Sequence, residues 1–282
     1  MCQYIYALRS TFGGTMLLKD KVIIVTGAAG GLGEGIARVC HREGAQVVIA
    51  DIRGEAAQEV AASLGERSLA VTCNVAEDAH LRNLVAATLA HCGRIDGLVN
   101  NAGVNFVKPF LETTPADWER VINVDLRAVF FLTQLVCRQM LSQSPRGGAI
   151  VNIASVHSML GYPGAGPYDA AKWGVVALTK AIALEMATQG IRVNAISPGL
   201  VNTQIWRDLL AAVPDPEAVK AHWNANIPME RTIEPEEIGE LAAFLLCERS
   251  SAMTGANVFA DAGLTSSLVS KEQYTIRPIE GE

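Results

Sequence analysis

The sequence lacks an excess of positive charge, because 29 Asp and Glu residues outnumber 23 Lys and Arg residues and leave a formal net charge of −6 at pH 7. Phosphate contacts require clustered positive charge, so this balance argues against a nucleic-acid-binding protein. No run approaches the roughly 18 apolar residues that a membrane-spanning helix requires. Hydrophobic residues still make up 50% of the 282 residues, which provides for a sizeable core and excludes wholesale disorder.

The sequence also lacks any C-x-x-C pair, although it contains six cysteines. Neither a disulfide framework nor a zinc site of the usual spacing is therefore indicated, and we expect no metal ion. Most of the cysteines lie inside apolar stretches, which favours buried, reduced thiols and a cytoplasmic location. They are Cys2, Cys40, Cys73, Cys92, Cys137 and Cys247.

The two ends of the chain differ from the rest. Residues 1–15 carry one basic residue and a short, broken apolar patch, whereas a secretory signal needs a longer apolar stretch and a cleavage site. We interpret residues 1–15 as a disordered extension or a start-site artefact, followed by a single domain over residues 16–268. Residues 269–282 are a C-terminal extension to which the sequence assigns no role.

Between the two ends, apolar strand-like runs alternate with helical patterns. The expected strands cover residues 22–26, 46–50, 69–73, 97–100, 149–154, 192–196 and 258–260. The expected helices cover residues 33–43, 55–64, 77–90, 115–141 (one helix or two joined), 168–188 and 235–247. This alternation predicts an α/β fold with a single doubly wound parallel sheet of Rossmann type and helices on both faces. Ligands of such sheets bind beyond the carboxyl ends of the strands.

Glycines follow the first expected strand at Gly27, Gly31 and Gly33. They let the backbone turn tightly and let a phosphate approach the amides at the positive end of the next helix. Glycine turns also serve packing, and this G-x-x-x-G-x-G spacing differs from the G-x-G-x-x-G fingerprint. Asp51 ends the second strand, where a carboxylate can accept hydrogen bonds from an adenosine ribose and repel a 2′-phosphate. Asp51 therefore favours NAD over NADP, although Arg53 competes with it, and a solvated acid at the strand end is the alternative.

Polar and small residues follow the next two strands. Asn74 follows the third strand and either meets the adenine edge or closes an Asx turn. The fourth strand ends in Asn100, Asn101, Ala102 and Gly103, whose small residues let the backbone run close to a ligand. Each of these signals is weak alone, but all of them lie at the expected ligand-binding edge.

A serine, a tyrosine and a lysine follow the fifth strand. Ser155 ends that strand, Tyr168 begins the next expected helix, and Lys172 lies four residues later on the same helix face. A phenol has a pKa near 10, which a neighbouring ammonium lowers. The pair is thus a proton donor and acceptor usable nearer neutral pH. An ordinary surface pair shows the same spacing, so the pair needs support from other motifs.

In combination, these motifs resemble the short-chain dehydrogenase/reductase family over about residues 18–266. They occur in the family's order and with its spacings. The matching pieces are TGAAGGLG at 26–33, Asp51, NNAG at 100–103, Asn123 within INVDL, Ser155, YDAAK at 168–172 and PGLVNT at 198–203. The chain departs from the family at Asn74, where the family usually has Asp, so we expect slightly altered coenzyme affinity.

The resemblance implies hydride transfer between a nicotinamide and a secondary alcohol or ketone, with NAD as the coenzyme and NADP as the weaker candidate. Tyr168 would exchange a proton with the substrate oxygen, and Ser155 would hydrogen-bond that oxygen. Lys172 would hold the nicotinamide ribose and lower the pKa of Tyr168. Asn123 would hold a water that links Lys172 to solvent. These four are the expected catalytic residues.

The resemblance also implies which residues bind the coenzyme. Leu32 would approach the pyrophosphate through its backbone, and Val201 and Thr203 would contact the carboxamide. The full set is Gly27, Gly31, Leu32, Gly33, Asp51, Asn74, Val75, Asn101, Ala102, Gly103, Tyr168, Lys172, Val201 and Thr203.

The substrate is less well defined by the sequence. His157, two residues after Ser155, is positioned to donate to a substrate oxygen, and a structural histidine is the alternative. Trp206 and Trp223 lie in an expected lid, where they line an apolar pocket or pack against the core or a subunit interface. A polyol, sugar or cyclic alcohol is the leading substrate class. A 3-oxoacyl-thioester reductase and a catalytically silent dinucleotide-binding regulator are the alternatives. The resemblance implies a homotetramer, without nucleic-acid or membrane partners.

Overall fold

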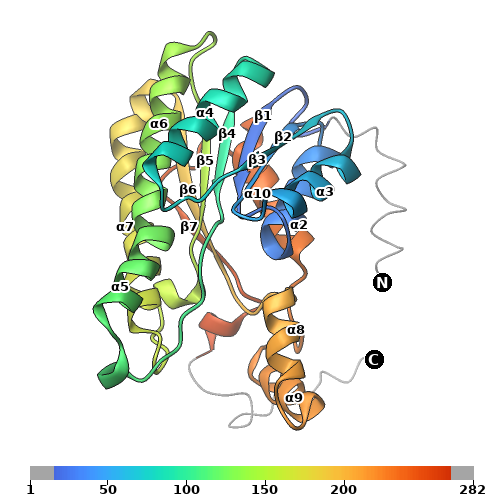
Figure 1. Cartoon of the computed structure of the whole chain (residues 1–282), viewed down its shortest axis with the longest axis vertical. Helices are drawn as coiled ribbons and strands as arrows, with labels where there is room; N and C mark the ends of the chain where they lie inside the picture. Colours follow the sequence, from blue (N-terminus) through green and yellow to red (C-terminus); the bar gives the residue numbers. More distant parts are fainter. Residues whose placement is uncertain (1–15, 268–282) are drawn as a thin grey trace, which may run out of the picture.

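A computed structural model describes residues 16–267, so the expectations for residues 1–15 and 269–282 lie outside the described residues (Figure 1). Within this range, seven parallel strands form one sheet in the order β3-β2-β1-β4-β5-β6-β7. The strands are β1 Val22–Thr26, β2 Gln46–Asp51, β3 Ser68–Thr72, β4 Gly97–Asn100, β5 Gly148–Ile153, β6 Ile191–Pro198 and β7 Asn257–Ala260. The predicted fold class is confirmed, whereas the domain bounds of 16–268 stay a prediction.

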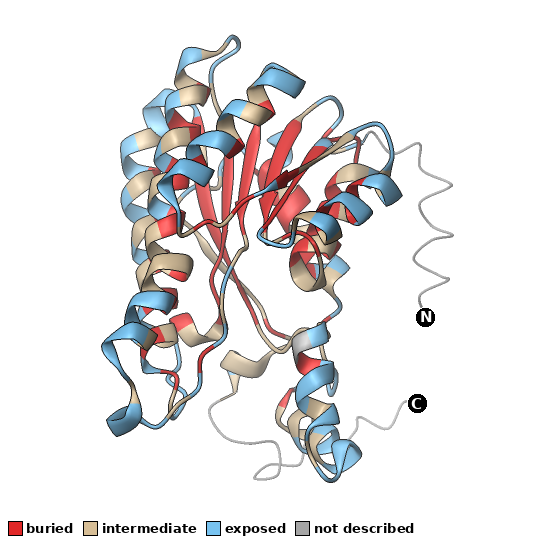
Figure 2. Cartoon of the chain, in the orientation of Figure 1, coloured by how far each residue is buried: buried red, intermediate tan, exposed pale blue. Residues whose placement is uncertain are grey.

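Helices cover both faces of the sheet. The α-helices of the described residues are α2 Gly31–Arg42, α3 Gly54–Leu64, α4 Asp78–Cys92, α5 Pro115–Ile122, α6 Ala128–Ser142, α7 Gly166–Met186, α8 Gln204–Ala211, α9 Pro216–Asn226 and α10 Pro235–Leu246, of which six cover the sheet. α2, α3 and α10 pack on the face of β1 that carries Ile23 and Val25, while α4, α6 and α7 pack on the face that carries Ile24 (Figure 1). Because both faces are covered, β1 is apolar at nearly every position and buried throughout (Figure 2).

The segment expected as one helix or two joined helices over residues 115–141 is continuous but not uniform. α5 begins at Pro115 because Thr114 and Asp117 form a capping box and proline suits the first helical position. A π-helical segment, η2 Asn123–Arg127, then joins α5 to α6. A π-turn holds more residues than an α-turn, so side chains beyond it face other directions than an α-helical pattern predicts.

The stretch between β6 and α10 contains two helices that the sequence pattern does not predict. α8 and α9 lie beyond the lower end of the sheet in Figure 1. α9 begins where the Asp215 side chain accepts a hydrogen bond from the amide of Ala218 (3.0 Å), followed at once by Pro216. An N-cap acid before a proline is the local signal for this helix start.

The cysteines are largely buried, as the composition predicts. Cys40, Cys73, Cys137 and Cys247 are buried, Cys92 is half-buried, and Cys2 lies outside the described residues. Burial raises the pKa of the Cys40 thiol to about 12 and that of Cys137 to about 11, which makes both thiols unreactive. Among residues 16–267, no cluster of three or more His, Cys, Asp or Glu is arranged to hold a metal ion. No helix in that range is long and apolar enough to cross a membrane.

A buried chain of polar side chains crosses the middle of the sheet. Asn100 of β4 donates from Nδ2 to Oδ1 of Asn152 in β5 (2.8 Å) and to Oγ1 of Thr133 in α6 (3.0 Å). Asn152 in turn donates to Oγ1 of Thr179 in α7 (2.9 Å). All four residues are buried, where an unpaired amide is costly. The chain therefore ties α6 and α7 to the two central strands that end at the candidate site.

Replacing Asn152 with Ala should remove two of these hydrogen bonds and leave Asn100 and Thr179 with unpaired groups. We expect the free energy of unfolding to fall by about 2–3 kcal/mol. Urea denaturation measures this. Asn83→Ala, at an exposed position of α4, is the matched control and should change stability by less than about 0.5 kcal/mol. Equal effects of the two variants would contradict the assignment.

Candidate functional site

The glycine turn after β1 has a backbone that only glycine adopts without strain. Gly27 and Gly31 have φ values of +63° and +55°. A Cβ at Gly33 would lie 2.2 Å from the carbonyl oxygen of Gly27, and one at Gly27 would lie 2.8 Å from Cα of Ala102. Gly27 and Gly33 are thus required by the close approach of backbone segments, and Gly31 by its positive φ.

Hydrogen bonds clamp this turn to the loop after β4. Oγ1 of Thr26 accepts from the amides of Asn101 (3.0 Å) and Ala102 (3.1 Å). The side-chain amide of Asn101 donates to the carbonyls of Thr26 (2.9 Å) and Gly27 (3.1 Å). The structure therefore brings together two predicted coenzyme-binding segments that are about 75 residues apart, as the separations of these bonds show.

α2 begins inside this clamp. Its N-cap is Gly30, which supplies no side-chain acceptor to the amides of the first turn. Thr203 lies across from this turn, because a Cβ at Gly31 would be 3.6 Å from the Thr203 side chain. A helix N-terminus that follows a glycine-rich turn fits the pyrophosphate of a dinucleotide. Leu32, also in the first turn of α2, is half-buried.

Asp51 is buried at the end of β2 and is held by backbone amides. Its Oδ2 accepts from the amide of Ala29 (3.0 Å), and its Oδ1 accepts from the amide of Arg53 (2.9 Å). The carboxylate has lone pairs left for ribose hydroxyls. The guanidinium of Arg53 lies beside it, with Nε 3.4 Å from Oδ1, and reaches to within 3.2 Å of the position that a Gly30 Cβ would occupy. Acid and base thus lie next to each other at the glycine turn.

Asn74 adopts the Asx turn that the sequence left as one of two options. The side-chain Oδ1 of Asn74 accepts from the backbone amide of Ala76 (3.1 Å). The backbone amide of Asn74 donates to Nδ1 of His80 (3.0 Å). Val75 is buried next to it. The side-chain oxygen that was expected to accept from adenine therefore already accepts one local bond.

Tyr168 and Lys172 lie on one face of α7, near the end of β5. Lys172 is only 4% exposed, and its Nζ donates to the carbonyl of Ile153 (3.2 Å) and lies 5.3 Å from the centre of the Tyr168 ring. Ser155, two residues after β5, accepts at Oγ from the amide of His157 (3.3 Å). The strand end and the helix thus hold the three predicted residues in one region.

Asp125 is the residue of this region that sequence reasoning missed. It is 0% exposed, and its Oδ2 lies 3.2 Å from Nζ of Lys172. Burial alone would lower the pKa of Lys172, but the charges of Asp125 and Tyr168 raise that pKa above its ordinary value. Asn123, which was expected to serve Lys172, lies two residues earlier in η2, about half a turn around a helix. The carboxylate within INVDL was the sequence signal that could have indicated Asp125. The direction of its side chain, however, depends on the π-helical geometry of η2.

His157 lies beside Tyr168, and Asp169 fixes the orientation of its ring. Its ring is edge-to-face with that of Tyr168, with centres 5.1 Å apart, and its Nδ1 lies 2.5 Å from Oδ1 of Asp169. Asp169 also accepts from the amide of Tyr162 (3.1 Å). The second ring nitrogen of His157, Nε2, makes no hydrogen bond to any residue in the described part of the chain. That nitrogen is available to a ligand.

A second set of bonds fixes η3 Val156–Ser158, the short 3-10 helix that carries His157. Oγ of Ser158 lies 2.9 Å from Oγ of Ser197 in β6, which donates to Oδ1 of Asn257 in β7 (2.8 Å). Three consecutive strands of the sheet, β5, β6 and β7, thereby position this part of the site.

The residues after β6 have two different surroundings. Val201 forms a bridge with Ile233, which returns the chain towards α10. Trp206 of α8 is buried edge-to-face against Trp223 of α9, with ring centres 6.1 Å apart. Trp206 thus joins the two helices, the packing alternative that the sequence left open, and its role towards a substrate stays a prediction.

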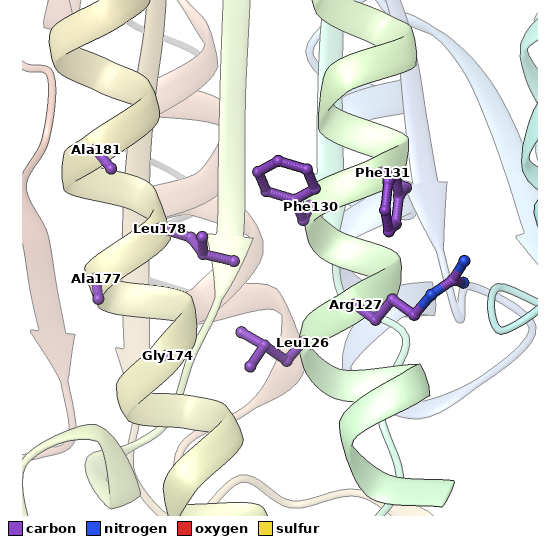
Figure 3. A pocket seen from close by; sticks show the side chains of 8 residues that line it. All are labelled: Leu126, Arg127, Phe130, Phe131, Gly174, Ala177, Leu178 and Ala181. Atoms are coloured by element: carbon purple, nitrogen blue, oxygen red, sulfur yellow. The ribbon is translucent and has the colours of Figure 1, made fainter. Parts of the chain in front are cut away.

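A separate apolar groove of about 500 Å³ runs along the outer faces of α6 and α7 (Figure 3). Arg127 is the charged residue in its lining. The lining residues are Leu126, Arg127, Phe130, Phe131, Gly174, Ala177, Leu178 and Ala181.

Comparison with known proteins gives matches over most of the chain. A family model described as enoyl-(acyl carrier protein) reductase matches residues 27–265. The chain is 38% identical to meso-2,3-butanediol dehydrogenase of Serratia marcescens, over 89% of this chain and 97% of the relative. 

Two solved structures, both 32% identical, share the fold. A short-chain type dehydrogenase/reductase from Mycobacterium marinum superposes with a TM-score of 0.82, covering 90% of this chain and 98% of that one. A 3-ketoacyl-(acyl-carrier-protein) reductase from Brucella melitensis, complexed with NADH, superposes with a TM-score of 0.80, covering 88% and 99%. Together with the glycine turn and the Tyr168–Lys172 pair, these matches show that the chain is an oxidoreductase of the short-chain dehydrogenase/reductase family.

Proposed function

We propose that this protein transfers hydride between NAD(H) and a secondary alcohol or ketone, with Tyr168 as the general acid and base. The observation that supports this most strongly is the buried ammonium of Lys172, 5.3 Å from the Tyr168 ring. A cation at this distance in a low-dielectric site attracts the negative charge that develops on the Tyr168 oxygen while its proton is transferred. A silent dinucleotide-binding protein would have no need of this arrangement.

The chemistry follows from the residues at the end of β5 and the start of α7. Ser155 donates a hydrogen bond to the substrate oxygen and holds it beside the Tyr168 hydroxyl. During alcohol oxidation Tyr168 accepts the hydroxyl proton, and during ketone reduction it returns one. Lys172 stabilises the phenolate in both directions. The nicotinamide, when bound, supplies or accepts the hydride at its C4 position.

The coenzyme site would combine the start of α2, the end of β2 and Lys172 of α7. The amides at the start of α2 would hold the pyrophosphate, Asp51 the adenosine ribose, and Lys172 the nicotinamide ribose. Val201 and Thr203 would contact the carboxamide, and Gly103 would line the nicotinamide end. The buried carboxylate of Asp51 supports NAD, while the neighbouring Arg53 is the one feature that supports NADP.

The leading substrate class is a polyol, sugar or cyclic alcohol. His157 supports a substrate with a second oxygen, because its Nε2 is available next to Tyr168 and Asp169 fixes its ring. The resemblance to a butanediol dehydrogenase agrees with this class. A 3-oxoacyl thioester is the second candidate, supported by the match to the Brucella melitensis reductase. The net charge of −6 opposes docking of an acidic carrier protein. The unreactive thiols support a reducing, cytoplasmic compartment.

Tyr168→Phe should abolish turnover and leave the coenzyme site intact, because the phenyl ring keeps the packing and loses only the proton carrier. We expect less than about a tenth of the wild-type rate of alcohol oxidation, with NADH affinity within about twofold of wild type. A panel of polyols, cyclic alcohols and 3-oxoacyl thioesters followed by NADH absorbance, together with NADH titration, measures both. A variant that retained more than a tenth of the rate would exclude Tyr168 as the proton carrier.

Asp51→Ala should narrow the preference for NAD over NADP, because the variant loses an acceptor for the ribose and a charge that repels the 2′-phosphate. We expect the ratio of kcat/KM values to change by about tenfold or more, which is roughly 1.4 kcal/mol. Arg53→Ala is the matched variant, since it should move the ratio in the opposite direction. If neither variant changed the ratio of kcat/KM values, Asp51 and Arg53 would not determine the preference between NAD and NADP.

We also propose that the protein is a homotetramer in which a second copy covers the groove along α6 and α7. The groove is apolar apart from Arg127, and Phe130 in it and Trp173 near it on α7 are exposed (Figure 3). Exposed apolar patches of this kind mark association surfaces.

Phe130→Glu should place a charge in this interface and dissociate the assembly. We expect the sedimentation mass to fall from that of a tetramer towards the 30.0 kDa of one chain. Phe110→Glu is the control, because Phe110 is exposed on η1 Phe110–Glu112, outside the groove. A wild-type mass near that of one chain would exclude the tetramer at once.

A further inference from the structure

Asp169 binds two groups of the chain beside the candidate active site. Its Oδ1 lies 2.5 Å from Nδ1 of His157, and its Oδ2 accepts a hydrogen bond from the backbone amide of Tyr162 (3.1 Å). Asp169 also lies in the first turn of α7, where the helix dipole favours a negative charge. Both carboxylate oxygens therefore serve the chain as hydrogen-bond acceptors.

This carboxylate determines which ring nitrogen of His157 carries the proton. An ionised carboxylate only accepts hydrogen bonds, so its contact with Nδ1 requires a proton on Nδ1. A neutral imidazole has a single N–H, so Nε2 keeps a lone pair and acts as an acceptor. Nε2 makes no hydrogen bond within residues 16–267, and the His157 side chain is 26% exposed, so a ligand can reach the ring.

His157 is also close to the groups that would hold the reacting oxygen. Its ring centre lies 5.1 Å from that of Tyr168, and its backbone amide donates to Oγ of Ser155 (3.3 Å). The ring of Tyr162 lies near it as well, with centres 6.0 Å apart. A substrate whose oxygen is bound by Ser155 and Tyr168 therefore brings the atoms next to its reacting carbon towards the imidazole.

We propose that Asp169 fixes His157 as a hydrogen-bond acceptor, and that His157 thereby selects substrates with a second hydroxyl group beside the reacting one. These are vicinal diols and the hydroxyketones formed from them. The inference rests on the proposed function of Tyr168 and Ser155, and its direction is opposite to the donation by His157 that the sequence suggests. A second carbonyl oxygen has no proton to donate and would face the Nε2 lone pair, so dicarbonyl compounds and 3-oxoacyl thioesters are disfavoured.

The acceptor role can be tested with alcohols that share one carbon skeleton. The pairs are cyclopentanol with cis-1,2-cyclopentanediol and 2-butanol with meso-2,3-butanediol, each oxidised with NAD. The kcat/KM of the wild type should be at least about tenfold higher for each diol, because the mono-alcohol leaves Nε2 of His157 unpaired. His157→Leu should reduce this ratio to about one or below. A wild-type ratio near one, or a ratio that His157→Leu leaves unchanged, would overturn the proposal.

Asp169→Asn tests the position of the proton, because the amide of Tyr162 orients the new side chain. The new amide oxygen accepts from Tyr162, so the new NH₂ group donates to Nδ1 of His157. Nδ1 then carries no proton, and Nε2 becomes a donor. The kcat/KM for reduction of 2,3-butanedione relative to acetoin should therefore rise by about tenfold or more over the wild-type ratio. An unchanged ratio would reject Asp169 as the residue that places the proton.

Asp20→Asn is the matched control for this variant. Asp20 is exposed and precedes β1, at the end of the strand away from the candidate site. Its φ of +61° is a conformation that asparagine also adopts. The same chemical change at this position should leave the ratio for 2,3-butanedione and acetoin at the wild-type value.

The position of the proton can also be measured without turnover, at alkaline pH, where histidine side chains are neutral. In magic-angle-spinning 15N spectra of histidine-labelled protein, His157 gives the signals that His157→Leu removes. The N–H should be at Nδ1 in the wild type and at Nε2 in Asp169→Asn. A wild-type proton on Nε2 would contradict the proposal.

The same spectra separate this inference from the proposed reaction. In the complex with NADH, which cannot oxidise an alcohol, cis-1,2-cyclopentanediol should shift the Nε2 signal of His157 and cyclopentanol should not. If the diol shifts this signal but no alcohol is oxidised with NAD, the acceptor role is upheld and the proposed hydride transfer is rejected. If alcohols are oxidised but the diol shifts the signal no more than cyclopentanol does, the reaction stands and the acceptor role is rejected.

Discussion

Lys172 carries a positive charge that is only 4% exposed, and withdrawing an ammonium group from water is costly unless other groups replace the hydration. Three parts of the chain supply the replacement. The carbonyl of Ile153 comes from the end of β5, the carboxylate of Asp125 from η2, and the face of the Tyr168 ring from one turn earlier in α7. The position of one side chain therefore links a strand, a π-helical segment and the helix that carries the candidate proton donor.

The coenzyme end of the site depends on a different principle, the exclusion of side chains. The side chains of Thr26 and Asn101 hold the turn after β1 against the loop after β4 through hydrogen bonds to backbone groups. Glycine at Gly27 and Gly33 lets these segments approach to distances at which any Cβ would collide. At the Lys172 end of the site a buried charge is compensated, and at the glycine turn side-chain atoms are absent. Gly103 combines both features, because the missing Cβ leaves space for the Asp125–Lys172 pair.

Features that depend on local residue order could be predicted from the sequence. Apolar runs alternating with helical patterns predicted the parallel sheet, and the Tyr168–Lys172 spacing predicted a shared helix face. Features that depend on exact helical phase could not be predicted. The role of Asn123 towards Lys172 came from the family resemblance and stays a prediction, whereas the contact between Asp125 of η2 and Lys172 was missed. The Asx turn of Asn74 and the packing of Trp206 on Trp223 were both open alternatives. The residues adjacent in the sequence do not determine which partner a side chain contacts in the folded protein.

The paired amides of Asn100 and Asn152 have a consequence for how the sheet assembles. They are opposite each other in the parallel pairing of β4 and β5. Sliding either strand by one residue would turn its amide to the other face of the sheet, away from Thr133 and Thr179. Apolar strands alone tolerate such a slip, since one valine replaces another at little cost. The two amides do not tolerate it, because a slip would break their hydrogen bonds. They therefore fix the alignment of β4 and β5, the strands that lead into the candidate site.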